Sequence, residues 1–181
     1  MKKMVSFFAE MNLPNKLTML RMALVPVYLV LLSLGLDWLA LLVFAAASIT
    51  DALDGKIARK HNLITNFGKF MDPIADKLLT HTAFIMLCSM GRLHVAACIL
   101  FIAREFVVSG LRLVAVEQGH VIAAGMSGKI KTVLQMILAL WLTAFGANMI
   151  GNLLSIAAAA MTLYSMVEYV FKNRAVLGGA K

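Results

Sequence analysis

Long apolar stretches separated by short polar segments set the pattern of this chain. A helix needs about 20 mostly apolar residues to cross a lipid bilayer, and six stretches approach or exceed that length. We expect six transmembrane helices, at residues 17–35, 38–57, 68–90, 95–116, 130–145 and 153–171. Residues 117–128 are expected to form a loop.

The first 15 residues, MKKMVSFFAEMNLPN, combine a basic start with a short apolar patch. A secretory signal peptide would need a longer apolar run followed by a cleavage site with small residues. Glu10 and Pro14 interrupt any such run. The segment is therefore predicted to be an interfacial helix lying on the cytoplasmic leaflet.

Composition supports an all-α integral membrane protein. Hydrophobic residues make up 61% of the chain and charged residues only 14%, which is far more apolar than an average soluble domain. The length of 181 residues suits one domain, residues 1–181. Cys88 and Cys98 both lie in apolar surroundings, which favours small packing residues over a disulfide or a metal pair.

The basic residues predict the orientation in the membrane. If the six helices are correct, only Arg92 lies on one side, and 16 of the 17 Lys and Arg residues lie on the other. The positive-inside rule places the basic side, with both termini, in the cytoplasm. The net charge of the chain is +8, and its basic residues flank the apolar spans, where they would lie beside anionic lipid head groups. It therefore points to a membrane surface rather than to nucleic acid.

One stretch breaks the apolar pattern. Residues 51–76 read DALDGKIARKHNLITNFGKFMDPIAD and hold four of the chain's nine acidic residues. On a helix at 100° per residue, one arc of about 140° holds Asp51, Asp54, Gly55, Ala58 and Arg59.

A second helix is predicted to carry the rest of this constellation. Gly68, Asp72 and Asp76 are spaced i, i+4, i+8 and form one stripe. Polar residues 60–67 allow the chain to turn, so that two antiparallel helices present four carboxylates to one another. Like charges so close disfavour one another's ionisation, and two divalent cations would cancel them. Hard oxygen ligands point to Mg²⁺ or Mn²⁺ rather than zinc.

Acidic residues at this spacing are commonly the wet face of a surface helix. Here the neighbouring residues 39–50 and 74–90 are more apolar than a solvated helix would be. A carboxylate at membrane depth costs about 2.5–3.5 kcal/mol on insertion scales and is functional by default. The metal site is therefore the favoured interpretation.

The pattern D-x2-D-G-x2-A-R-x8-G-x3-D-x3-D is present at residues 51–76 without a gap. It resembles the signature of the CDP-alcohol phosphotransferases. The resemblance implies that Asp51, Asp54 and Asp72 are metal ligands, and that Asp76 both contacts the metal site and acts as general base. It also implies that Arg59 binds the diphosphate of a CDP-linked substrate.

The small residues of the pattern have two interpretations. Gly55, Ala58 and Gly68 lack bulk where a nucleotide would approach the backbone. Close helix packing in a membrane also uses small residues. Both roles are compatible with the sequence.

A second, basic constellation bears on the acceptor alcohol. Its members are Arg104, Arg112, Lys129 and Lys131. Cations near one cytoplasmic cavity would suit an acceptor with its own phosphate dianion, although they could also be membrane-surface anchors. Lys129 and Lys131 are about 200° apart on a helix, so both reach one site only if the helix has barely begun there.

The segments NLPNKLTMLR, AREFVVSGLRLVAVEQGH and GKIKTVLQM are similar to the bacterial branch of the family that uses glycerol 3-phosphate. This resemblance implies transfer of a phosphatidyl group from CDP-diacylglycerol to sn-glycerol 3-phosphate, in the cell membrane, with the active site facing the cytoplasm. It further implies that Asn15 and Thr18 help close the nucleotide pocket, and that the chain is a homodimer.

Three other functions are consistent with parts of the sequence. A sibling enzyme could use inositol phosphate or a second phospholipid as acceptor. A divalent-cation transporter would need polar residues along a path to the far side, but the outer halves of the predicted spans are almost wholly apolar. A CDP-lipid hydrolase would leave the basic constellation without a role.

Overall fold

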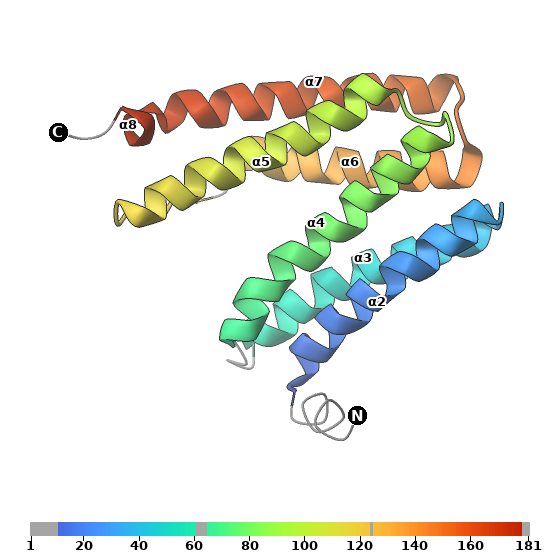
Figure 1. Cartoon of the computed structure of the whole chain (residues 1–181), viewed down its shortest axis with the longest axis horizontal. Coiled ribbons are helices and arrows are strands. Elements are labelled where there is room, and N and C mark those ends of the chain that lie inside the picture. Colours follow the sequence, from blue (N-terminus) through green and yellow to red (C-terminus); the bar gives the residue numbers. More distant parts are fainter. Residues whose placement is uncertain (1–10, 61–64, 124, 179–181) are drawn as a thin grey trace. The chain divides into compact units, whose positions relative to one another are not determined.

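The computed structural model describes residues 11–60, 65–123 and 125–178, and for residues 51–60, 66, 69 and 177 it describes the backbone alone. The regular structure of the described residues is helical, which confirms the all-α prediction for that part of the chain (Figure 1). The helices are α2 (Leu13–Ser33), α3 (Asp37–Lys60), α4 (Asn66–Ser89), α5 (Val95–Glu117), α6 (Met126–Phe145), α7 (Met149–Lys172) and α8 (Arg174–Leu177).

The helix boundaries follow the predicted ones closely. α5 ends at Glu117 and α6 begins at Met126, so most of the predicted loop lies between two helices. α2 already begins at Leu13, inside the expected interfacial segment, whose residues 1–10 lie outside the described residues. Pro73 lies within α4, which begins at Asn66.

Local chemistry accounts for several of these helix ends. The Asn12 side chain accepts a hydrogen bond from the Asn15 N–H at 3.1 Å, and the Asn148 side chain accepts one from the Gly151 N–H at 2.8 Å. Both are N-caps that satisfy a donor left over at the first turn. The turn after α2 contains Gly35 at φ +73°, a left-handed conformation that glycine adopts without strain.

The described helices form two compact units, Met1–Met86 and Leu87–Lys181. The first contains α2, α3 and most of α4, and α2 packs along α3. The rings of Tyr28 on α2 and Phe44 on α3 are 5.5 Å apart between centroids, and both side chains are fully buried.

The second unit contains α5 to α8. α7 packs against both α5 and α6, and α8 packs against α5. Phe101, Leu138 and Ala158 contribute buried side chains from α5, α6 and α7 respectively. At the far end of α6, Arg92 Nη1 donates to the Thr143 carbonyl at 3.1 Å and satisfies one of the last acceptors of that helix.

Three helices of the described part of the chain are long and apolar enough to cross a membrane, namely α2, α6 and α7. α5 carries Arg104, Glu105 and Arg112 near its middle, and α4 carries Asp72, Asp76 and Lys77. Charged residues at membrane depth are rare and mark functional sites. Half of the eight charged residues of α4 and α5 are predicted site residues, namely Asp72, Asp76, Arg104 and Arg112.

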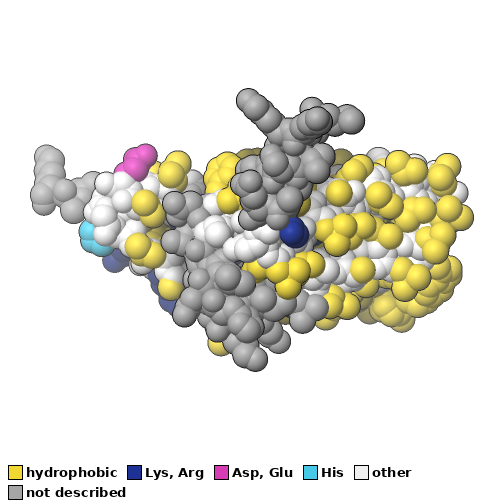
Figure 2. Space-filling model, turned by 90° about the horizontal axis from the view of Figure 1, so that it is seen from below, with side chains coloured by type: hydrophobic (Ala, Val, Ile, Leu, Met, Phe, Trp, Pro, Cys, Tyr) yellow, Lys and Arg dark blue, Asp and Glu magenta, His cyan; other side chains and the backbone are white. Residues whose placement is uncertain are grey.

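The outward-facing surface is strongly apolar. Val30, Ile85, Phe106 and Ile156 are more than half exposed, as are many other large hydrophobic residues. Figure 2 shows hydrophobic side chains over much of one face, with few charged ones between them. Such extended apolar patches mark membrane or protein contacts, which agrees with three helices long and apolar enough to cross a membrane.

Candidate active site

The first half of the signature lies on the final turns of α3, which is helical through Lys60. Asp51, Asp54, Gly55, Ala58 and Arg59 therefore lie on one helix, as their predicted common arc requires. Their side chains are outside the described residues. Their roles as metal ligands and substrate contacts remain predictions.

The second half of the signature lies at the start of α4, where Asp72 meets α2. The Thr18 hydroxyl lies 2.6 Å from Oδ1 of Asp72, across 54 positions of sequence. This short distance is typical of a hydroxyl that donates to a carboxylate. Thr18 is fully buried. One oxygen of the predicted metal ligand is therefore held by a neutral donor from α2.

A second contact joins the same two helices one turn away. The Thr65 hydroxyl donates to Oδ1 of Asn15 at 3.0 Å and accepts from the Gly68 N–H at 3.0 Å. Thr65 thereby caps the first turn of α4. Asn15 is 6% exposed. Residues 15 and 18, which are one helical turn apart on α2, thus both contact the start of α4.

Gly68 is buried at the centre of this contact. A Cβ atom there would lie 3.0 Å from Asn15 Oδ1, 3.3 Å from Thr65 Oγ1 and 3.5 Å from Asp72 Oδ2. A side chain at this position would therefore force Asn15 and Thr65 to shift by a few tenths of an ångström. Close packing is therefore one reason for a glycine at this position, and its role beside a nucleotide stays a prediction.

Asp76 follows Asp72 by one turn of α4 and is half-buried. The two carboxylates share a helix face, as predicted from their spacing. Among the side chains that the structure describes, no group of three or more His, Cys, Asp or Glu gathers at a distance suited to a metal ion. Two of the four predicted ligands, Asp51 and Asp54, are outside that set.

Arg21 is a buried residue of this unit to which sequence analysis assigned no role. It is fully buried on α2, and its Nε donates to the Ala47 carbonyl of α3 at 3.3 Å. Ala47 precedes Asp51 by four residues, or about one helical turn. The signal that could have identified Arg21 is its position, because it continues the helical spacing of Asn15 and Thr18.

The basic constellation lies in the second unit, where Arg104 and Lys131 meet at Glu105. Arg104 Nη1 lies 2.6 Å from Oε1 of Glu105, and the Lys131 ammonium pairs with the same oxygen. Arg104 is 7% exposed and Lys131 is 3% exposed. Such ions are tolerated away from water only when they are paired and hydrogen-bonded.

A third helix completes the contacts of Arg104. Its Nη2 donates to Ser165 Oγ of α7 at 3.0 Å. A Cβ atom on Gly128 would lie 3.1 Å from the same nitrogen, so the guanidinium packs against the first turn of α6. Arg104 Nε is buried and has no hydrogen-bond partner among the described residues.

The other two predicted cations are placed differently. Arg112 Nε donates to the Tyr169 hydroxyl at 2.9 Å, beside the apolar cluster of Val108, Leu111 and Tyr169. Lys129 is exposed at the first turn of α6. The structure thus brings two of the four cations together at Glu105.

Sequence analysis did not select the polar residues of α7. Ser165 contacts Arg104, Tyr169 contacts Arg112, and the Thr162 hydroxyl accepts from Gln135 Nε2 at 3.1 Å. Residues 162, 165 and 169 are at helical spacing, so they lie on one face. Polar residues that repeat at this spacing within an apolar helix were the available signal.

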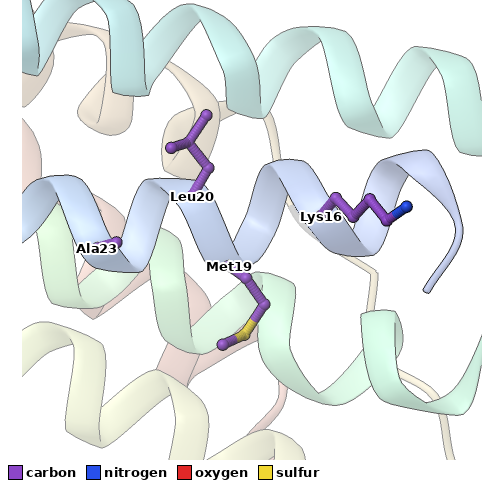
Figure 3. Close-up of a pocket in the computed structure, with 4 residues that line it drawn as sticks. All are labelled: Lys16, Met19, Leu20 and Ala23. Atoms are coloured by element: carbon purple, nitrogen blue, oxygen red, sulfur yellow. The ribbon is translucent and has the colours of Figure 1, made fainter. Parts of the chain in front are cut away.

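A hollow of about 440 Å³ on α2 is separate from these contacts. Lys16, Met19, Leu20 and Ala23 line it (Figure 3). At 100° per residue, these positions lie on the side of α2 opposite Thr18 and Arg21. Its described lining is apolar apart from Lys16. None of the predicted site residues is among these four lining residues.

Comparison with known proteins agrees with the signature. The family model for CDP-alcohol phosphatidyltransferases matches residues 11–168. A Bacillus subtilis protein is 45% identical over 141 residues, which are 70% of this chain and 73% of the relative. A Rickettsia bellii protein is 40% identical over 168 residues, covering 87% and 93% of the two chains.

A Shigella flexneri protein is 34% identical over 178 residues, covering 93% of this chain and 98% of the relative. All three relatives are named CDP-diacylglycerol–glycerol-3-phosphate 3-phosphatidyltransferase. The matched region includes Asn15 and Thr18, the complete acidic signature and the buried cations of the second unit. The chain therefore belongs to the CDP-alcohol phosphatidyltransferase family.

Proposed function

We propose that this protein transfers the phosphatidyl group of CDP-diacylglycerol to sn-glycerol 3-phosphate, with phosphatidylglycerophosphate and CMP as products. The observation that carries the proposal is the complete acidic signature, in a chain whose relatives carry that activity in their names. Their similarity extends through both compact units. We also infer that residues 1–181 act as one catalytic domain.

The acidic signature would hold two divalent cations, Mg²⁺ or Mn²⁺, through Asp51, Asp54, Asp72 and Asp76. The family is generally dependent on divalent metals. Asp72 fits this role because its carboxylate is part-buried and oriented by Thr18, and carboxylate oxygens are the ligands that hard cations prefer. When bound, the ions would stabilise negative charge on the phosphoryl oxygens and acidify the attacking hydroxyl.

The residues of the chain would carry out the remaining steps. Arg59 binds the diphosphate through charge-assisted hydrogen bonds, with Gly55, Ala58 and Gly68 leaving room beside it. Asp76 accepts the proton of the acceptor hydroxyl. The hydroxyl oxygen then forms a bond to the phosphorus that carries diacylglycerol. The bond from that phosphorus to the bridging oxygen breaks, and CMP leaves with the electron pair.

The acceptor phosphate would bind to the basic constellation of Arg104, Arg112, Lys129 and Lys131. The convergence of Arg104 and Lys131 on Glu105 supports this assignment. So does the buried Nε of Arg104, which has no partner among the described residues. An oxygen-rich dianion would satisfy it, whereas an uncharged alcohol would leave two buried cations with a single carboxylate. This favours glycerol 3-phosphate over an acceptor without a phosphate.

We further propose six membrane-spanning helices, an interfacial segment at residues 1–15 and cytoplasmic termini. In the second unit, Lys131 and Thr143 lie near opposite ends of α6, and Arg92 binds the Thr143 carbonyl. A 20-residue helix spans about 30 Å, close to the thickness of the hydrocarbon core. Arg92 and the basic constellation would then face opposite sides of the cell membrane. The family resemblance favours a homodimer.

Product identification tests the activity directly. The purified chain would be given CDP-diacylglycerol with one labelled acceptor at a time: glycerol 3-phosphate, glycerol, inositol, inositol phosphate or serine. We expect a labelled lipid with glycerol 3-phosphate alone, and only with Mg²⁺ or Mn²⁺ present. Efficient use of inositol phosphate instead would identify a sibling enzyme. Formation of phosphatidic acid without an acceptor would identify a hydrolase.

Site-specific labelling tests the topology. In a variant without Cys88 and Cys98, single cysteines beside Lys60, Lys129 and Arg92 would be exposed to a membrane-impermeant maleimide in intact cells. We expect labelling at Arg92 only, with the other two becoming reactive after permeabilisation. Labelling beside Lys60 from outside would contradict the cytoplasmic active site.

A further inference from the structure

The contact between α2 and Asp72 joins an uncharged hydrogen-bond donor to a carboxylate. Among the described contacts, Asp72 is held by an uncharged hydroxyl, that of Thr18, at 2.6 Å. A hydroxyl donor orients a carboxylate without neutralising it, whereas an arginine or lysine partner would compete with a metal ion for its charge. Buried ligands of metal sites are commonly oriented by such outer hydrogen bonds.

Thr18 is poorly placed to bind a substrate itself. Its side chain is fully buried, and its hydroxyl is within hydrogen-bond distance of two protein oxygens, Asp72 Oδ1 at 2.6 Å and the Pro14 carbonyl at 3.1 Å. A threonine in a helix commonly bonds the carbonyl four residues earlier. Its single proton favours the closer, charged acceptor. A nucleotide acceptor could therefore take this proton only by replacing Asp72.

The surrounding residues hold Thr18 and Asp72 next to each other. Asn15, one turn before Thr18, accepts from Thr65, which in turn caps α4 at Gly68. Asp72 follows Gly68 by one further turn. A Cβ atom at Gly68 would be in ordinary van der Waals contact with Asp72 Oδ2, at 3.5 Å, so a side chain there would occupy the space beside this carboxylate. The two contacts on α2 therefore fix both the start of α4 and the carboxylate one turn later.

We propose that Thr18 is a positioning residue of the metal centre, which orients Asp72 through Oδ1 and leaves its other oxygen for a divalent cation. This role replaces the nucleotide contact expected from the sequence, and it rests on the proposed function because that function supplies the metal. Asn15 supports the same geometry through Thr65. Neither residue needs to contact the CDP-lipid.

Binding of Mn²⁺ to the full chain tests this role without requiring turnover. Free Mn²⁺ would be measured by electron paramagnetic resonance in detergent–lipid micelles, for the wild type, Thr18→Val and Thr18→Ser. Loss of an outer-shell partner typically lowers metal affinity by about 10–100-fold, so we expect that loss in Thr18→Val. Thr18→Ser retains the hydroxyl and should bind Mn²⁺ nearly as the wild type does.

Controls separate this proposal from the function on which it rests. Thr82→Val removes a hydroxyl from the same helix as Asp72, where it bonds only the Leu78 carbonyl among the described contacts, and should leave Mn²⁺ affinity unchanged. Absence of Mn²⁺ binding in the wild type, or retention of it in Asp72→Asn, would reject the proposed metal centre itself. Thr18→Ala would replace Thr18→Val if the valine variant does not fold.

The KM for CDP-diacylglycerol distinguishes the positioning role from a direct contact of Thr18 with the nucleotide. If Thr18→Val binds Mn²⁺ like the wild type but raises this KM, Thr18 contacts the nucleotide and the positioning role is wrong. Unchanged Mn²⁺ affinity with an unchanged KM would also overturn it. Weaker Mn²⁺ binding that Thr18→Ser restores is the result that supports it.

Discussion

The two compact units hold their buried polar residues in chemically opposite ways. In the first, a carboxylate of the predicted metal centre, Asp72, is held by the neutral hydroxyl of Thr18. In the second, the cations Arg104 and Lys131 are held by a charged partner, Glu105. The first arrangement leaves the carboxylate charge for a cation, and the second makes two buried cations tolerable before an anion binds.

The units share a different feature. The buried stripe of α2 begins with Asn15, Thr18 and Arg21 and becomes apolar from Val25 onward. The buried stripe of α6 likewise begins with Lys131 and Gln135 and continues with Leu138. In each unit the buried stripe of one helix thus starts with polar residues and continues with apolar ones, although that of α6 ends at the polar Thr143. In the proposed topology both of these helix ends would face the cytoplasm.

Asp76→Asn should have the largest effect on activity, because it removes the predicted general base in the first unit. General-base catalysis typically contributes about 10²–10⁴-fold, and we expect a loss of kcat in this range with CDP-lipid binding largely intact. Steady-state kinetics at saturating Mg²⁺ would measure it. Asp37→Asn, at the other end of α3, is the control and should remain active. Retention of more than a few per cent of activity by Asp76→Asn would remove the general-base role.

Lys131→Met should affect the acceptor alone. A lost charge-assisted hydrogen bond costs about 1.5–3 kcal/mol, or about 10–150-fold in kcat/KM. The change should raise the KM for glycerol 3-phosphate and leave the KM for CDP-diacylglycerol nearly unchanged. We expect Lys129→Met to have a smaller effect, because Lys129 is exposed and Lys131 is buried.

Arg104→Gln and Arg112→Ala extend this test to the other two cations. Arg104→Gln should resemble Lys131→Met, since both residues meet Glu105. If these variants raise the KM for the CDP-lipid and spare that for glycerol 3-phosphate, the basic constellation does not bind the acceptor. The contrast between an acidic metal unit and a basic acceptor unit would then be wrong.

Glu105→Gln should destabilise the second unit. Removing one partner of a buried ion pair commonly costs about 3–5 kcal/mol because the other charge stays buried. Thermal unfolding in detergent would report the loss as a lower Tm. Glu168→Gln breaks the exposed pair with Lys172 and serves as the matched control, with little change expected. Equal stability of both variants would show that Glu105 is not needed to hold the cations.

The smallest effects should be those on stability when one glycine in each unit is replaced by alanine. Gly68→Ala places a Cβ atom 3.0 Å from Asn15 Oδ1 and should lower Tm by forcing α2 away from α4. Gly110→Ala meets nothing within 4 Å on α5 and should raise stability by up to about 1 kcal/mol through helix propensity. A Gly68→Ala variant as stable as the wild type would indicate that α2 and α4 do not pack so closely.

The sequence by itself determined the helical class, the positions of the long helices and the family. Apolar runs of near-membrane length leave a helix as the simplest way to satisfy the backbone. The signature at residues 51–76 depends on residue identity and spacing, both of which are visible without a structure. The placement of Asp72 and Asp76 on one face of α4 follows from helical periodicity alone.

Only the tertiary structure decided which side chains meet across helices. Thr18 and Asp72 are 54 positions apart, and Arg104 and Ser165 are 61 apart, so no local pattern relates them. The same holds for Lys131 and Lys129: periodicity shows that they point in different directions, but the packing of α5 and α7 decides which is buried. Helical periodicity specifies directions around one axis, and the neighbours in those directions depend on how the helices pack.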